Sequence, residues 1–545
     1  MEDAEKTPSQ SGVRNIGSNS NSTSSGSDSE ISLASATIHH DVQVSSQSSP
    51  QAEDGVNVTV VGFSGLDDPA SPYNWPTKKK VFVLVSATLT AVNSTLGSTL
   101  PSNLFYPYLQ NEFHVPAGPQ TVLPASLYLV GFVFGPLIFA PLSEQYGRKP
   151  ILVTGFALFL LSTLGAALAQ QWWVFLLFRF FSGTFGSPPL SVFGGVIADC
   201  WKDDVERGRM LMIWSAATFI GPLGAPIMAG YISPVLGWRW AFWIALIYAG
   251  VSFASVVLLP ETLASKILQK KAAKLNKRNT EAGKRFVAPA DLQGKSVAAA
   301  LKTTLLRPLQ LIRYEMMVIL TSVYIAFIYA LFYMLVQIIP AVFKGIYGFS
   351  SGVTGIMFTI IGAGTIVGCF ICWWSDPVTL RLSARHPKKR AEYLRLPLAC
   401  VGGPIFVVSI LWFGLTSRES IHWAVPFVAL FPYGIAYNII WVAMINYVAD
   451  AYGIYSASAL AALGTTRSVA GALIPLAVED MIKTLGVAKS CVLLAGISAG
   501  LAVVPFCFIA YGDKIRSASR FSTAVKTEMR QQDEGLARTT SLSAV

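Results

Sequence analysis

Charged residues are scarce in this sequence. Only 13% of its 545 residues are Asp, Glu, Lys or Arg, whereas about 25% is usual for a soluble domain. So few charged side chains cannot cover the surface of a water-soluble protein of this length. The composition therefore argues against a cytosolic protein, a secreted protein and a nucleic-acid-binding protein.

Motifs for catalysis and cofactor binding are also missing. The sequence contains no paired-His metal motif and no phosphate-binding Gly loop with a Lys. Residues Gly348–Gly352 and Gly496–Gly500 match the spelling of a nucleophile elbow, but both lie at or inside apolar stretches with no His nearby. We therefore expect neither an enzyme nor a bound metal or organic cofactor.

Long apolar runs, by contrast, are abundant. About 20 mostly apolar residues are needed to cross the hydrocarbon core of a bilayer. We predict twelve spans, at residues 80–101, 121–142, 151–170, 173–197, 210–232, 238–259, 315–340, 352–374, 396–416, 423–446, 456–478 and 489–511. These spans must be helices, because only internal pairing satisfies a backbone that lies in lipid. The expected fold class is an all-α polytopic membrane protein.

The Lys and Arg residues predict the orientation of these spans. Most of the 41 Lys and Arg residues fall in segments that become cytoplasmic if the amino terminus is cytoplasmic, as the positive-inside rule requires. An even number of spans then places both termini inside. The net charge of +11 is explained by this topology and by anionic inner-leaflet lipid. The lipid bilayer is therefore an expected partner, and no nucleic acid is needed.

Three polar segments flank or divide the spans. Residues 1–79 begin with a Ser-rich stretch poor in aromatics, and we predict a disordered cytoplasmic tail there. Residues 261–314 form a basic cytoplasmic loop that divides the spans six and six. Residues 512–545 form a polar cytoplasmic carboxy-terminal tail.

The connection between the second and third spans has a distinctive composition. It contains Gly135, Glu144, Gly147, Arg148 and Lys149. A tight turn between two helices requires Gly, and one acid with two bases would form a charge latch on the cytoplasmic side. Ordinary positive-inside loop chemistry is the alternative. These residues resemble the signature loop of the major facilitator superfamily, except that Glu144 replaces the usual Asp and Gln145 the usual Arg.

The fourth span carries Arg179 in its middle. A charge at mid-helix costs about 2.5–3.5 kcal/mol on insertion scales, so it usually faces a cavity or a partner. Its position resembles a buried Arg of this superfamily that is implicated in proton coupling. Structural pairing with helix carbonyl groups, or a position near the membrane interface, is the alternative.

The fifth span has a face of small residues four positions apart, which favours close helix approach. This face is formed by Ala217, Gly221, Ala225 and Ala229. Pro222 and Pro226 should bend the helix. Together with Gly224, the Gly221-Pro222 pair resembles the motif that distinguishes drug–proton antiporters from sugar-type facilitators, although Ala225 replaces the usual second Gly.

Further motifs narrow the resemblance to the fungal twelve-span branch of drug:proton antiporters, over residues 70–520. These motifs are Tyr73–Pro76, Gly237–Trp240, Leu259–Thr262, Tyr455–Ala462 with Arg467, and Tyr511–Arg516. The resemblance implies two six-helix bundles, residues 80–260 and 315–511, around a central site. It also implies a monomeric exporter in a fungal plasma membrane, driven by a proton gradient. A vacuolar location, a polyamine exporter and an uptake facilitator are the alternatives.

Polar and aromatic residues within the spans are candidates for the wall of that site. Tyr and Trp combine a flat apolar body with one polar atom, which suits loosely selective binding of amphiphilic compounds. Packing between helices is the alternative for each aromatic stripe. The candidates are Asn93, Tyr329, Tyr333, Gln337, Tyr433, Tyr437, Asn438 and Trp441.

The charges within the spans predict the class of cargo. Arg179 and Arg467 lie deep in spans, whereas all acids lie in tails, loops or span ends. A dication such as a polyamine would need a desolvated carboxylate as its partner. We therefore hypothesise a small neutral or anionic amphiphile as cargo. The acid that couples a proton stays open among Glu144, Asp199 and Asp450 on the inner side and Glu479 and Asp480 on the outer side.

Overall fold

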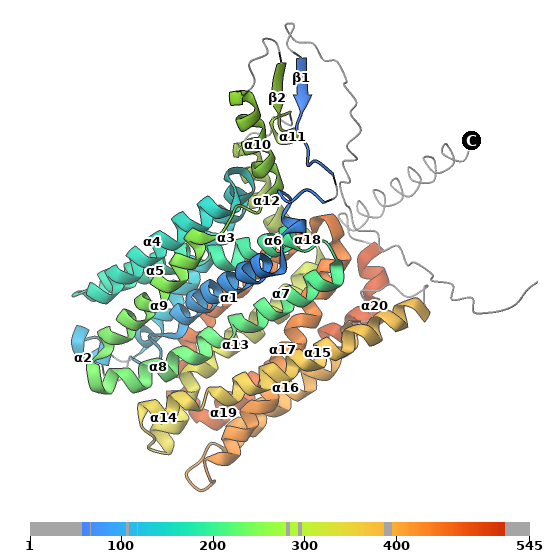
Figure 1. Ribbon diagram of the computed structural model, residues 1–545. Helices are drawn as coiled ribbons and strands as arrows, with labels where there is room; N and C mark the ends of the chain where they lie inside the picture. The colour runs from blue at the N-terminus through green and yellow to red at the C-terminus, as the bar shows by residue number, and fades with distance from the viewer. Residues whose placement is uncertain are drawn as a thin grey trace, which may run out of the picture. The chain divides into compact units, whose positions relative to one another are not determined.

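The computed structural model describes residues 57–65, 67–104, 108–116, 118–278, 284–292, 297–385 and 395–517. The predicted disordered tail up to residue 56 and the predicted tail beyond residue 517 lie outside these residues. Within them the chain is almost entirely helical, and its long helices run side by side (Figure 1).

The apolar runs predicted from the sequence form the long helices. The elements of the first half are η1 (Pro72–Asn74), α1 (Thr77–Thr99), α2 (Gln110–Phe113), η3 (Pro119–Thr121), α3 (Leu123–Tyr146), α4 (Arg148–Leu168), α5 (Trp172–Gly186), α6 (Pro188–Cys200), α7 (Asp204–Thr218), α8 (Ile220–Leu236) and α9 (Trp238–Leu258). Those of the second half are α13 (Met316–Pro340), η4 (Ala341–Ile346), α14 (Ser351–Ile356), α15 (Thr359–Arg385), α16 (Leu396–Thr416), α17 (Ala424–Tyr452), η6 (Gly453–Tyr455), α18 (Ser456–Leu473), η7 (Ile474–Ala477), α19 (Val478–Leu501) and α20 (Val504–Ser517).

Ten helical stretches in the described part of the chain are long and apolar enough to cross a membrane. Two features reconcile this number with twelve predicted spans. The stretch from Ser456 to Gly512 holds two spans, because it contains a turn at Gly486. The fourth span is divided at Ser187 into α5 and α6, of 15 and 13 residues. The twelve-span prediction is confirmed on this basis.

Single glycines connect three pairs of successive spans. Gly147, Gly237 and Gly486 have φ of 106°, 88° and 75°, and their ψ values are 156°, 160° and 167°. A residue with a Cβ is strained at such positive φ values, so glycine allows the chain to reverse within one residue. The tight turn predicted at Gly147 is therefore present, and the same device recurs at two other turns.

Prolines break the fifth span where the sequence predicts a bend. Pro222 has no N–H to donate to the carbonyl of Thr218, and the helix is interrupted between Thr218 and Ile220. Pro226 likewise leaves the carbonyl of Pro222 without an intrahelical donor. The hydroxyl of Thr99 on α1 donates to that carbonyl at 2.9 Å. The bend is thus stabilised by a neighbouring helix.

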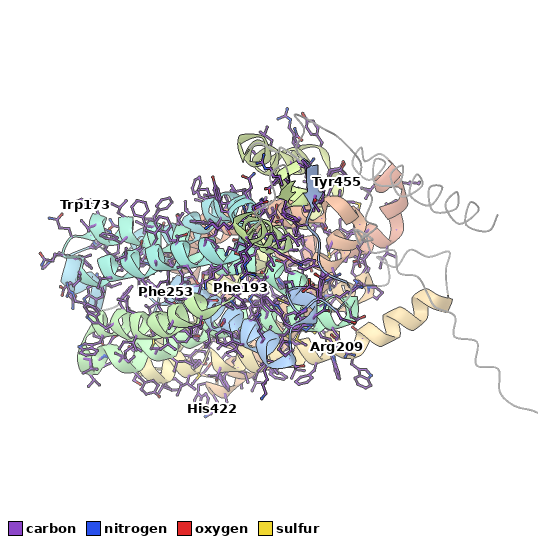
Figure 2. The ribbon with its side chains drawn as sticks, turned by 45° about the horizontal axis from the view of Figure 1, so that its top comes forward. Trp173, Phe193, Arg209, Phe253, His422 and Tyr455 are labelled. Atoms are coloured by element: carbon purple, nitrogen blue, oxygen red, sulfur yellow. The ribbon has the colours of Figure 1, made fainter. Side chains whose placement is uncertain are left out.

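The central segment between the halves contains α10 (Ala264–Arg278), β2 (Lys284–Val287), α11 (Pro289–Leu292) and α12 (Val297–Tyr314). We call the end of the helices next to this segment the basic end and the opposite end the distal end. In Figure 1 α10, α11 and β2 lie beyond the basic end, whereas α2 and α14 lie at the distal end. In Figure 2 Trp173, at the start of α5, lies far from Tyr455, which precedes α18.

The prediction of disorder over all of residues 1–79 is wrong for the described part of that segment. Asn57–Val60 form strand β1, which pairs in parallel with β2 of the central segment. Val61 packs in a small apolar cluster with Leu268 and Ala272 of α10. Asp68 accepts hydrogen bonds from the Ser64 and Ala70 N–H groups, and these bonds lower the pKa of its carboxyl. This segment orders because a distant part of the chain provides both a strand edge and an apolar surface.

The two halves of the chain meet along α3 and α18, and they also meet at the distal end. The backbone of α14 approaches α8 closely, since a Cβ on Gly355 would lie 2.7 Å from the Cα of Ile227. The Asn103 side chain donates to the carbonyls of Pro226 at 2.9 Å and Ser351 at 3.1 Å. These contacts seal the distal end between the halves.

Candidate functional site

An aromatic cluster from α13 and α17 lies near the middle of the spans. The hydroxyls of Tyr329 and Tyr333 are 3.4 Å apart. The rings of Tyr437 and Trp441 stack with an interplanar angle of 6°, and the Tyr329 ring lies 6.2 Å from that of Trp441. Four of the predicted wall residues are therefore in one cluster, on two neighbouring helices.

Arg467 of α18 lies against this cluster. Its guanidinium carbon is 5.2 Å from the Tyr329 ring and 4.8 Å from the Trp441 ring. These distances are in the range of cation–π interactions. The side chain is half-buried, and its Nε has no hydrogen-bond partner among the described residues. Arg467 thus places a positive charge with unused donor capacity beside a flat aromatic wall.

Residues of the first half complete the cluster across the interface between the halves. The ring of Phe219, at the break in the fifth span, meets those of Tyr437 at 5.4 Å and Trp441 at 6.4 Å. The Tyr333 hydroxyl donates to Ser98 of α1 at 2.9 Å. We call Tyr329, Tyr333, Tyr437, Trp441, Arg467 and Phe219 the central cluster. Because it spans both halves, motion of one half against the other must change its shape.

Gln337 lies on the distal side of the central cluster. Its side chain donates to Ser102, just after α1, at 3.3 Å, again across the interface. Gln337 therefore belongs with the contacts of Asn103 and Gly355 that close the distal end, which we call the distal seal. It lies one helical turn away from the aromatic wall.

Three predicted wall residues are buried against residues of their own half, although the Tyr433 ring also lies 6.2 Å from that of Tyr437 at the edge of the central cluster. Asn93 is buried in the first half and reaches the carbonyl of Ala245 at 3.4 Å. Tyr433 is buried and stacks at 4.9 Å on Phe406 of α16. Asn438 is buried against Gly368 of α15. The packing alternative fits these three residues better than a role in the wall.

Arg179 is buried, with 2% of its surface exposed. Its Nε donates to the carbonyl of Pro124 at 3.1 Å and its Nη2 to that of Gly97 at 2.5 Å. The Gly97 carbonyl lacks an intrahelical donor because the residue four positions later is Pro101. The guanidinium also lies 4.5 Å from the Tyr128 ring. This geometry is structural pairing with helix carbonyls, the alternative that the sequence left open.

The loop between α3 and α4 contains a latch, but with different acids from the one expected. Glu144 is exposed and forms no ion pair with any described residue. Arg148 pairs instead with Asp199 at 3.3 Å and donates to the Ser143 hydroxyl at 2.8 Å. Glu261 accepts from the backbone N–H groups of Arg148 at 2.9 Å and Lys149 at 3.2 Å. It thereby caps the amino terminus of α4, where a carboxylate is favourable.

The small residues of the predicted motifs differ in how closely they are packed. A Cβ on Gly221 would lie 2.5 Å from the Val92 carbonyl oxygen of α1, whereas one on Gly224 would meet nothing within 4 Å. A Cβ on Gly135 would collide with the side chain of Ser187. Gly221 and Gly135 are therefore sites of close helix contact, and Gly224 is not.

Phe219 and Glu261 are functional candidates that the sequence did not single out. The span-five break at Pro222 was the available signal for Phe219. The Leu259–Thr262 motif was the signal for Glu261, but nothing in it indicated a partner more than a hundred residues earlier.

Comparisons with known proteins fit this architecture. The family model described as the Major Facilitator Superfamily matches residues 84–475. The multidrug transporter mdrA of Aspergillus fumigatus is 33% identical over 86% of this chain and 77% of its own. The efflux pump FUB11 of Gibberella fujikuroi is 36% identical over 73% of this chain and 70% of its own. The solved structure of a D-xylose–proton symporter has a similar fold, with a TM-score of 0.58 and 15% identity over 78% of this chain and 97% of its own.

Proposed function

Because the chain belongs to the major facilitator superfamily and is a multi-pass membrane protein, we propose that it is a secondary active exporter of small amphiphilic compounds. The observation that carries this proposal is the similarity to efflux pumps along most of the chain. Relatives named as efflux or multidrug transporters are 32–36% identical over 73–86% of its length.

The central cluster is the proposed cargo site. Its aromatic faces offer apolar contact, and Arg467 offers one positive charge. No described acid forms an ion pair with Arg467 or Arg179; Glu315 lies at the basic end of α13, where it accepts from the Tyr452 hydroxyl at 3.0 Å. A desolvated anion would therefore find a partner at the central cluster, whereas a dication would not. The favoured cargo is a neutral or monoanionic aromatic compound.

The orientation in the membrane is proposed from the same charge pattern, and the direction of transport is proposed from the efflux relatives. The basic end, with the Lys-rich α10, is proposed to face the cytoplasm, as the positive-inside rule implies. Contacts between the halves close the distal end, and we propose that cargo enters from the opposite, basic side. The proposed membrane is a fungal plasma membrane, with the protein working as a monomer and without a cofactor.

A proton gradient is the proposed driving force. Asp199 pairs with Arg148, and Asp450 pairs with Arg395 at 2.8 Å, both at the basic end. Protonation of either acid would weaken a contact that holds helix ends together. These two acids are the preferred candidates for coupling, and an uncoupler that dissipates the pH gradient should stop net export. Undiminished export would instead identify a facilitator.

Substitution of Arg467 tests the proposed cargo site. In a sensitive host that expresses the chain, Arg467→Gln should lower export of a labelled aromatic carboxylic acid about tenfold or more, because a hydrogen bond to a charged group contributes about 1.5–3 kcal/mol. Export of the neutral methyl ester of the same acid should change less than threefold. Efflux of both compounds is measured from preloaded cells.

Arg418→Gln is the matched control, since Arg418 lies exposed in the loop after α16. It should leave export of both compounds unchanged. Competition by spermidine, without competition by organic acids, would refute the proposed cargo class. Accumulation of the labelled compounds in place of their loss would identify an importer.

A further inference from the structure

Glu479 connects the two halves of the chain at the distal end. It is the second residue of α19. Its Oε2 accepts a hydrogen bond from the Gly118 N–H at 3.0 Å and lies 3.0 Å from the Thr121 hydroxyl. Gly118 and Thr121 belong to the connection between α1 and α3. The carboxyl of one half thus binds the backbone of the other.

This contact differs in kind from its neighbours. The bonds from Tyr333 to Ser98, from Gln337 to Ser102 and from Asn103 to Ser351 also cross the interface, and all of them join neutral groups. Glu479 contributes an ionisable group to the same seal. Its side chain is 17% exposed, so a proton from the distal solution can reach it.

Protonation would weaken this contact and still leave Gly118 and Thr121, its described partners, with hydrogen-bonding groups to pair with. The Thr121 hydroxyl also lies 2.8 Å from the Gly118 carbonyl oxygen, and its single proton serves one acceptor at a time. With Glu479 protonated, the acid can donate to Thr121 and Thr121 to the Gly118 carbonyl. The Gly118 N–H then faces a neutral acceptor, and a charge-assisted bond is about twice as strong as a neutral one.

Among the described residues, few charged groups lie near Glu479. Lys483, one turn later on α19, lies 2.8 Å from Oε1 with its own side chain 55% exposed. Such an exposed pair contributes little. Asp480 is the adjacent acid. Among the elements packed against α19, η3, η7 and α16 contain no charged side chain, and α13 contributes only tyrosines as titratable groups. The α16 thiol of Cys400 lies at the basic end.

We propose that Glu479 is a distal latch that senses the pH of the solution into which cargo is released, an inference that rests on the proposed export function. Ionised, it holds the halves together at that end. Protonated from the distal solution, it lets them separate and speeds the opening that releases cargo. The proton returns to the same solution when the latch closes, because its site opens only to that side. Glu479 is therefore a positioning residue that acts on the opening step, and the proton that drives transport binds elsewhere.

Hydrogen–deuterium exchange of the full chain in nanodiscs tests this latch without any cargo. At neutral pH, the peptide that contains Gly118 should exchange about five- to tenfold faster in Glu479→Gln than in the wild type, because its N–H loses a charged acceptor. Asp480→Asn removes the same charge one residue away, and its exchange rate should match the wild type. After correction for intrinsic exchange, acidification should accelerate exchange in the wild type and leave Glu479→Gln unchanged.

The latch proposal is refuted if the Gly118 peptide exchanges as slowly in Glu479→Gln as in the wild type. It is also refuted if Asp480→Asn accelerates exchange of this peptide as much as Glu479→Gln does. If Glu479→Gln does not fold, Glu479→Asp is the second variant. It keeps the charge on a side chain that is one methylene shorter, and the Gly118 peptide should therefore exchange faster than in the wild type. Export assays on the same variants separate the two proposals. Faster exchange with no export from any chain, wild type included, leaves the latch intact and overturns the proposed function.

Discussion

Replacement of Arg179 by alanine should destabilise the protein by about 3–5 kcal/mol and abolish export as a result. Two hydrogen bonds from a charged donor would be lost, each contributing about 1.5–3 kcal/mol. The Gly97 carbonyl, already deprived of an intrahelical donor by Pro101, would be left unpaired inside the first half. The ring of Tyr128 would also lose its cation. Thermal unfolding of the purified protein and the yield of monodisperse protein measure this effect.

Arg467→Ala is the internal comparison for this result. Both substitutions remove an arginine from within a span, but Arg467 is half-buried and its Nε is unpaired. Arg467→Ala should therefore unfold at close to the wild-type temperature while losing export of the anionic compound. If Arg179→Ala folded like the wild type and lost only its dependence on the proton gradient, Arg179 would be a coupling residue, and the structural role assigned to it here would be wrong.

Alanine substitutions of two glycines that lie three residues apart in α8 should change the stability of the protein in opposite directions. A Cβ at position 221 would lie 2.5 Å from the Val92 carbonyl oxygen and 2.6 Å from the Leu96 nitrogen, both backbone atoms of α1. Gly221→Ala should therefore cost about 1–3 kcal/mol, the usual range for overpacking. It should also slow export at least tenfold, because α1 and α8 both carry contacts of the distal seal.

Gly224→Ala is its matched control. A Cβ there meets nothing within 4 Å, and alanine is favoured over glycine inside a helix by about 0.5–1 kcal/mol. This variant should be as stable as the wild type or slightly more so. Equal losses of stability and export rate in both variants would show that the helix needs flexible glycines. Close contact with α1 would then not explain why position 221 is a glycine. Unfolding temperature and export rate are measured side by side.

The aromatic stripes show how far periodicity alone can place a site. Tyr433, Tyr437 and Trp441 are four residues apart, so a helical wheel places them on one face. However, a helix has 3.6 residues per turn, and a spacing of four drifts by roughly 40° at each step. Over eight residues this drift turns Tyr433 toward Phe406 of α16, while Trp441 remains beside Arg467. The two ends of one predicted stripe therefore face different neighbours.

Contacts between residues far apart in the sequence are the second feature of the site that sequence patterns could not predict. The signature loop predicts a latch with Arg148, and the sequence offers Glu144 as the nearest acid. The structure supplies Asp199, 51 residues away, and Glu261, 113 residues away. Likewise, the strand at Asn57–Val60 forms only because β2 is available more than two hundred residues later. No local pattern specifies which of several acids or edges reaches such a position.

The sequence by itself determined the solvent and the helices of this protein. Scarce charge and long apolar runs leave lipid as the only medium in which the chain can fold, and prolines and glycines mark where its helices bend and turn, since these effects depend on each residue and its near neighbours. Tertiary structure alone decided the roles of the charged and polar residues. Arg179 and Arg467 are alike in the sequence, but one satisfies an orphan carbonyl inside a bundle and the other faces the aromatic interface between the halves. Burial and partner, which only packing supplies, make this difference.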